Sequence, residues 1–281
     1  MLVAASRWAT LQRAGSQSGP GRPHSLAATL QPDKGSITPA ATITVNSTSD
    51  VASGTDGLCT LREAITAANT NTASGAVAGE CAAGSSGGSD TIDMTGVSGT
   101  INLTGALPDI TSDLTINGPG SSQLTVTRNT GGDYRVFTVS APVTVAISGL
   151  AVTSGKTPAA PPGSPASTFN GGGIFNSGTL TLTDVNVSAN TTSVNIDTNS
   201  AGNGAGIANT GTLSLTSCSV TGNFGGNGIG GIGSGGNGGG ISSSGTLTVS
   251  NSTITGNQGG QGAIGSGTGG NGGGILLPAE R

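Results

Sequence analysis

The sequence predicts an all-β protein, a parallel β-helix with a short capping helix near its N-terminal end. A unit of about twenty residues recurs in the second half, and its register is marked by Ile174, Ile207, Ile241 and Ile275, at steps of 33, 34 and 34 residues. A fixed period of this size is typical of repeat architectures. Within each unit apolar and polar residues alternate, which predicts strands with one buried face. Only 2% of the 281 residues are aromatic and 53 are glycine, a composition that suits thin stacked coils better than a globular core.

Each repeat is expected to contribute three short strands to one coil. The first carries the register isoleucine, the second the TLTLT-like pattern of Thr179–Thr183, and the third residues such as Val185 and Val187. The register isoleucines should therefore stack along the axis, about 4.8 Å apart, as a continuous core. The first turn ends in Gly178, and its equivalents are Gly211 and Gly245. We expect these glycines to adopt a positive φ, which glycine allows without steric cost.

The remaining residues of each repeat are mostly Gly, Asn and Ser, and the sequence predicts loops extruded from one corner of the coil. They cover 191–203, 224–237 and 258–271. Just before them, asparagine recurs at one position, as Asn190, Asn223 and Asn257. These side chains either form a hydrogen-bonded ladder along the axis or are solvated turn residues, where asparagine is favoured in any case.

The first half of the chain precedes the regular repeats. Residues 1–40 are rich in Ser, Pro, Gly and Ala and are expected to be a disordered lead; the β-helix is expected over 41–281. Within it we expect an N-terminal cap over 41–89, less regular coils over 90–157 and Gly-rich repeats over 170–281. The last repeat is incomplete, which suggests a truncated product whose further repeats or anchor would lie beyond the C-terminus.

The cap is predicted from a helical segment inside Asp56–Asn71. Thr60 and Glu63 have the spacing of a capping box, and Leu61, Ile65 and Ala68 share one helical face. A short helix here would cover the first coil and hide its open edge. The alternative, in which Arg62 and Glu63 are site residues, is disfavoured because adjacent helical residues point apart.

The three cysteines carry information about compartment. Cys59 and Cys81 bracket the predicted helix, which suggests a disulfide and an oxidising environment; the alternative is a pair of free thiols. Two cysteines without histidine cannot complete a tetrahedral metal shell, so no metal site is expected. Cys218 is left over and is expected to be unpaired.

A family resemblance is carried by the segment CTLREAITAAN, Cys59–Asn69, followed by a second cysteine and then by Gly/Thr repeats. This pattern resembles the CSLREA-domain family of secreted bacterial proteins, with Thr60 where the motif has Ser. The repeats are more distantly similar to those of polymorphic outer membrane proteins. The resemblance implies a right-handed, pectin-lyase-like β-helix on an exported or surface protein, and it brings no catalytic residues with it.

Catalysis on a β-helix would require grouped carboxylates. Asp90 and Asp93 enter one strand on opposite faces, so neither is predicted to be catalytic. The alternative is a polysaccharide lyase or hydrolase that uses carboxylates and a basic residue. The other charged candidates for such a site are Asp109, Asp113, Asp133, Asp184, Asp197, Arg128 and Arg135. No cofactor is expected, because the Gly-rich runs lack the βαβ context of a dinucleotide site.

The charge distribution limits the partners. The net charge is −4, and no Lys or Arg occurs between Lys156 and Arg281, so nucleic-acid binding is not expected. No apolar run is long enough to span a membrane. The leading interpretation is a non-enzymatic extracellular or cell-surface module, structural or adhesin-like, that contacts an unknown partner or glycan. A lesser alternative is an ice-binding surface formed by outward Thr residues such as Thr181. The simpler explanation for these residues is that Thr is favoured on the solvated face of a strand.

Overall fold

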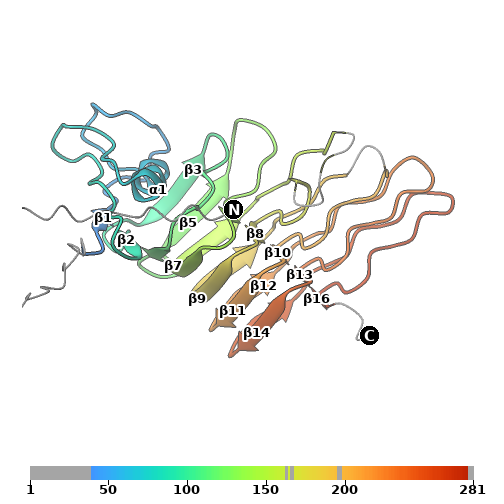
Figure 1. Cartoon of the computed structure of the whole chain (residues 1–281). Helices are drawn as coiled ribbons and strands as arrows, with labels where there is room; N and C mark the ends of the chain where they lie inside the picture. Colours follow the sequence, from blue (N-terminus) through green and yellow to red (C-terminus); the bar gives the residue numbers. More distant parts are fainter. Residues whose placement is uncertain (1–38, 162–163, 165–167, 195–197, 278–281) are drawn as a thin grey trace, which may run out of the picture. The chain divides into compact units, whose positions relative to one another are not determined.

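The computed structural model describes residues 39–277, except 162–163, 165–167 and 195–197. Residues 1–38 of the predicted lead, which was expected over 1–40, and the last four residues lie outside this part of the chain. The elements, labelled in Figure 1, are β1 (Thr42–Thr44), α1 (Leu61–Thr70), β2 (Asp90–Asp93), β3 (Gly99–Leu103), β4 (Leu114–Asn117), β5 (Leu124–Arg128), β6 (Phe137–Val139), β7 (Thr144–Thr153), β8 (Ile174–Asn176), β9 (Thr179–Ser188), β10 (Ile207–Asn209), β11 (Thr212–Thr216), β12 (Ser219–Thr221), β13 (Ile241–Ser243), β14 (Thr246–Ser250), β15 (Thr253–Thr255) and β16 (Ile275–Leu276).

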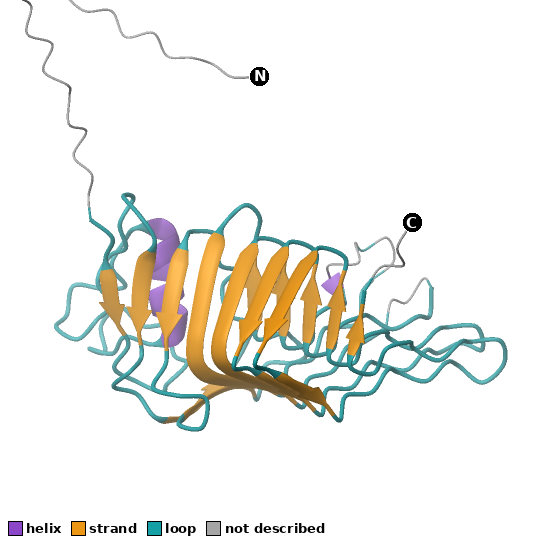
Figure 2. Cartoon of the chain, turned by 90° about the horizontal axis from the view of Figure 1, so that it is seen from below, coloured by secondary structure: helices purple, strands orange, loops and turns teal. Residues whose placement is uncertain are grey.

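The strands form two sheets, and every pairing between named strands is parallel. The larger sheet has the order β1-β2-β4-β7-β9-β11-β14, and β3, β5, β12 and β15 join it through the long strands β7 and β9. The smaller sheet has the order β6-β8-β10-β13-β16. Figure 2 shows β7 and β9 bending from one face of the coil into the next. Parallel pairing between strands of successive coils confirms the predicted β-helix.

The register isoleucines pair as the period predicts. Ile174 lies opposite Ile207, Ile207 opposite Ile241, and Ile241 opposite Ile275. The first three are fully buried, whereas Ile275 is 37% exposed because no described strand follows β16 in its sheet. Covering each isoleucine above and below stabilises the coil by about 1.5–3 kcal/mol. The isoleucine that recurs in each repeat therefore builds a continuous stack in the core.

The turn glycines do not adopt the predicted backbone conformation. Gly178, Gly211 and Gly245 have no positive φ. They are required instead by close approach, since a Cβ on Gly211 would lie 2.1 Å from the carbonyl oxygen of Gly178 and one on Gly245 would lie 2.0 Å from that of Gly211. The expectation of a positive φ is wrong, and the physical constraint is the narrow spacing between successive turns.

The Gly-rich loops pack on one another. Backbone amides of one loop donate to the next, as from Gly228 to Gln261 at 2.8 Å and from Gly235 to Thr268 at 2.9 Å. The outgoing and returning arms are also bonded, because the Gly236 amide donates to the Gly226 carbonyl at 2.9 Å. Figure 1 shows the loops stacked beside the smaller sheet. They therefore continue the hydrogen-bonded stacking of the coils beyond the strands.

Candidate functional site

The N-terminal cap is built around α1. Thr60 is its N-cap; the Glu63 amide donates to the Thr60 hydroxyl at 3.3 Å, and the Thr60 amide donates to the Glu63 carboxylate at 3.0 Å. This reciprocal pair is the capping box expected from the sequence. Leu61, Ile65 and Ala68 are buried, and the helix contacts β1 and β2. The described helix thus covers the first coils.

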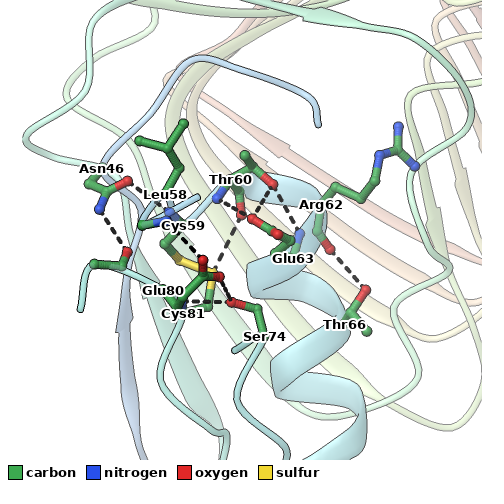
Figure 3. The surroundings of a disulfide bond; sticks show 12 residues. Asn46, Leu58, Cys59, Thr60, Arg62, Glu63, Thr66, Ser74, Glu80 and Cys81 are labelled. Carbon is green, nitrogen blue, oxygen red and sulfur yellow. Dashed lines mark hydrogen bonds between the residues drawn. A yellow bond between two sulfur atoms is a disulfide. The ribbon is translucent and has the colours of Figure 1, made fainter. Parts of the chain in front are cut away.

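A disulfide joins Cys59 to Cys81, as predicted, across a separation of 22 residues. Figure 3 shows it beside the start of α1, with hydrogen-bonded side chains around it. The Cys59 amide donates to Asn46 Oδ1 and the Cys81 amide to Ser74 Oγ, both at 2.8 Å. The bond closes the loop that carries the cap, and it fits an oxidising compartment.

Arg62 and Glu63 have structural partners. The Arg62 guanidinium donates to the buried carboxylate of Asp50 at 2.8 and 3.0 Å and to the Gly105 carbonyl at 2.8 Å. The Glu63 carboxylate also accepts from the Ser53 amide at 2.7 Å. A cavity of about 330 Å³ lies beside α1, and Glu63 is its only ionisable lining residue. Because both Glu63 oxygens are already hydrogen-bonded to the chain, the cavity offers no uncommitted acid or base.

Asp90 and Asp93 lie in β2 but do not act together. Asp90 is buried, and its carboxylate accepts from the backbone amides of Ala41 and Ser85 at 2.8–3.1 Å. Asp93 accepts from the hydroxyl and the amide of Thr95, which hold the pKa of the Asp93 carboxyl below its usual value. Each carboxylate therefore fixes a neighbouring backbone segment.

The remaining described aspartates are dispersed. Asp113 accepts from the Thr144 amide at 2.7 Å, Asp184 from the Ser121 hydroxyl at 2.7 Å, and Asp133 pairs with Lys156 at 2.7 Å. Asp197 lies outside the described residues. Among the described residues, no group of three or more His, Cys, Asp or Glu is placed to hold a metal ion.

The two arginines considered as catalytic partners form hydrogen bonds to backbone carbonyls. Arg128 Nε donates to the Ser154 carbonyl at 2.8 Å. Arg135 donates to the carbonyls of Thr168 and Asn170 at 2.9 Å, and its guanidinium lies over the Phe175 ring, 5.1 Å from the centroid. Burial lowers the pKa of Arg135 to about 10.

Asp109 and Arg135 both line a second cavity. Its volume is about 250 Å³, and Tyr134 and Thr138 are among its other lining residues. The Tyr134 hydroxyl oxygen lies 2.7 Å from the backbone carbonyl oxygens of both Leu103 and Thr130, which share its single proton. Of the ionisable groups there, Asp109 is the only carboxylate, so the paired carboxylates of a glycoside hydrolase are not assembled in this cavity.

Asparagine ladders run along the axis. Asn190 Nδ2 donates to Asn223 Oδ1, and Asn223 Nδ2 donates to Asn257 Oδ1, both at 2.9 Å. Of the two sequence-based alternatives, the structure shows the ladder. A second ladder, which the sequence analysis missed, runs through equivalent positions at the ends of β8, β10 and β13, namely Asn176, Asn209 and Ser243, with bonds of 2.7 and 2.8 Å. The recurrence of Asn or Ser before each turn was the available signal.

An array of outward residues covers the larger sheet. We call hydroxyl face twelve outward positions, three in each of β7, β9, β11 and β14, which the strand register aligns in three rows across the strands. All but Ala146 carry a hydroxyl. The rows are Thr144, Thr179, Thr212, Thr246; Ala146, Thr181, Ser214, Thr248; and Ser148, Thr183, Thr216, Ser250.

Comparisons with protein-family models, curated proteins and solved structures find no match. The resemblance to the CSLREA-domain family therefore stays a prediction. Within the described residues, no helix is long and apolar enough to cross a membrane.

Proposed function

We propose that this chain is a non-enzymatic β-helix module that acts outside the cytoplasm, at the cell surface or beyond it, by presenting its repeated polar faces to a partner. The observation that carries the proposal is what the charged side chains bind. Asp90 and Arg135, two of the catalytic candidates, bind backbone groups of their own chain. A reacting carboxylate or base must instead reach the substrate.

The extracellular location is supported by the disulfide at Cys59 and Cys81. Differential thiol labelling in the native cells tests it. Cells quenched in acid should give Cys59 and Cys81 that react only after reduction, and an antibody should detect the chain on intact cells or in the medium. Reduced cysteines at both positions and a wholly cytoplasmic chain would contradict the location.

The alternative, a polysaccharide lyase or hydrolase, retains one supporting observation, the cavity that places Asp109 beside Arg135. Purified protein should be incubated with polygalacturonate and with neutral polysaccharides, and both reducing ends and unsaturated products measured. We expect no turnover. Activity that disappears in Asp109→Asn but not in Asp113→Asn would replace the proposed function with the enzymatic one.

A further inference from the structure

The hydroxyl face repeats regularly in two directions. Thr181 pairs in register with Ser214, and Ser214 with Thr248, so the rows run straight across successive coils. Neighbouring parallel strands lie about 4.8 Å apart, and outward residues of one strand are about 6.6 Å apart. Figure 2 shows these strands side by side on one face of the coil. The result is a two-dimensional lattice of hydroxyl and methyl groups.

These hydroxyls are left for solvent. Within the described chain, the hydroxyls of Thr179, Thr181 and Thr183 make no hydrogen bond to protein groups, and all three residues are exposed. Ser148 is the exception in its row, since its hydroxyl bonds to Asn117 at 3.1 Å. Water can therefore hydrogen-bond to these exposed hydroxyls and bridge neighbouring ones.

The chemistry of the face selects an uncharged and regular partner. None of its twelve positions is charged, although the exposed Asp184 directly follows Thr183 in β9; beyond it, 185–277 contains a single charged residue, Asp197. The face also has no aromatic ring on which a sugar could stack. A charged surface has no counterpart there, and a flexible chain would lose conformational entropy on binding. A crystal of water is neutral and is already ordered.

We propose that the hydroxyl face binds ice crystals through an ordered layer of water held by its Thr and Ser rows. This names the partner class of the module and rests on the proposed function, since it requires a solvent-facing, non-enzymatic surface. The strands β1, β2 and β4 extend the same sheet, but Asp93 interrupts its uncharged surface there, so the site is confined to β7, β9, β11 and β14.

The test uses the full chain in two assays, partition into slowly grown ice and thermal hysteresis. Wild-type protein should enter the ice and depress the freezing point. Thr181→Tyr, in the middle of the face, should lose most of both activities, and Ser214→Tyr on the next strand should do the same. The control is Thr221→Tyr, an outward threonine of β12 between Ser188 and Thr255, which should behave as wild type. Unchanged thermal unfolding of all three variants would show that the fold is intact.

Exclusion of the wild type from ice with no hysteresis would overturn the proposal, and so would full activity in Thr181→Tyr. In either case the threonines would serve strand propensity alone. These outcomes are distinct from failure of the proposed function. A neutral glycan bound in place of ice would leave the non-enzymatic module standing, whereas polysaccharide turnover would remove it whatever the ice assays show.

Discussion

The Asn190 side chain donates to Asn223 Oδ1 at 2.9 Å, one coil further along the axis, and both residues are buried. The Asn190 backbone amide donates to the same oxygen at 3.0 Å. Asn223 in turn donates to the Val187 carbonyl at 3.0 Å. One side chain therefore satisfies polar groups of two coils at a place where water does not reach.

Asn223→Ala should destabilise the protein strongly. The substitution leaves the buried Asn190 donors and the Val187 carbonyl without their partner, and each buried orphan costs about 1–3 kcal/mol. We expect the free energy of unfolding to fall by about 2–4 kcal/mol in urea titrations. The control is Asn271→Ala, whose exposed side chain makes no bond within the described chain and should change stability by less than about 0.5 kcal/mol. Equal losses of unfolding free energy in both variants would contradict a stabilising role of the asparagine ladder.

Gly211→Ala tests whether glycine is needed at this turn for lack of space or for its backbone conformation. Its φ is not positive, but the new methyl would lie 2.1 Å from the Gly178 carbonyl oxygen. The coils would have to separate locally, and we expect a loss of about 1–3 kcal/mol or more, as for overpacked cores. Gly96→Ala is the matched control, because a Cβ there meets nothing within 4 Å and φ is not positive; it should be neutral or stabilising by up to about 1 kcal/mol. Calorimetric melting of both variants decides the case, and a neutral Gly211→Ala would show that the turns can separate freely.

Local signals predicted the fold well. The capping box depends on Thr60 and Glu63 alone, and the stacking of Ile174 on Ile207 on a constant period, so both could be deduced from the sequence. The conformation of Gly211 could not, because a sequence does not distinguish a glycine needed for φ from one needed for close approach. The hydroxyl face was predicted only over the regular repeats, since the irregular coil before them conceals that Ala146 pairs with Thr181.

The separation of the charged groups could also be predicted only in part from the sequence. Strand alternation in β2 indicated that Asp90 and Asp93 point to opposite faces, and the structure gives them separate partners. The cavity that brings Asp109 to Arg135 depends on the turn before β6 and the loop near Thr168. No sequence period sets those positions.

Reduction of the disulfide should destabilise the cap. Closing a loop of 22 residues restricts the unfolded chain, and its loss should cost about 3 kcal/mol in the chain-entropy view. The wild-type melting temperature should therefore fall when dithiothreitol is added. A Cys59→Ser, Cys81→Ser double variant should melt at the lower temperature with or without the reductant. A reductant effect that persists in this variant would place the sensitivity elsewhere.

The free thiol of Cys218 should make stability depend on alkaline pH. The residue is buried, and its Sγ–H contacts the carbonyls of Leu182 and Thr216 at 3.4 and 3.3 Å. Burial raises the pKa of the Cys218 thiol above its ordinary value, although nearby backbone hydrogen bonds oppose the shift. The folded state therefore favours the neutral thiol. The stabilisation from the neutral Cys218 thiol is fully present below the thiol pKa of the unfolded chain, about 8.5. It is lost as the pH rises through the higher pKa of the thiol in the folded state.

Urea unfolding at about pH 7 and about pH 10 should show this loss in the wild type. Tyr134 also has a raised pKa from burial and contributes in the same alkaline range, so the comparison must be made with Cys218→Ala, which keeps Tyr134. The variant should lose less stability than the wild type between the two pH values, and the difference isolates the thiol. The native thiol should also react slowly with a disulfide reagent at neutral pH and rapidly in urea. Identical pH dependence in both proteins would mean that the thiolate forms without cost in the folded coil.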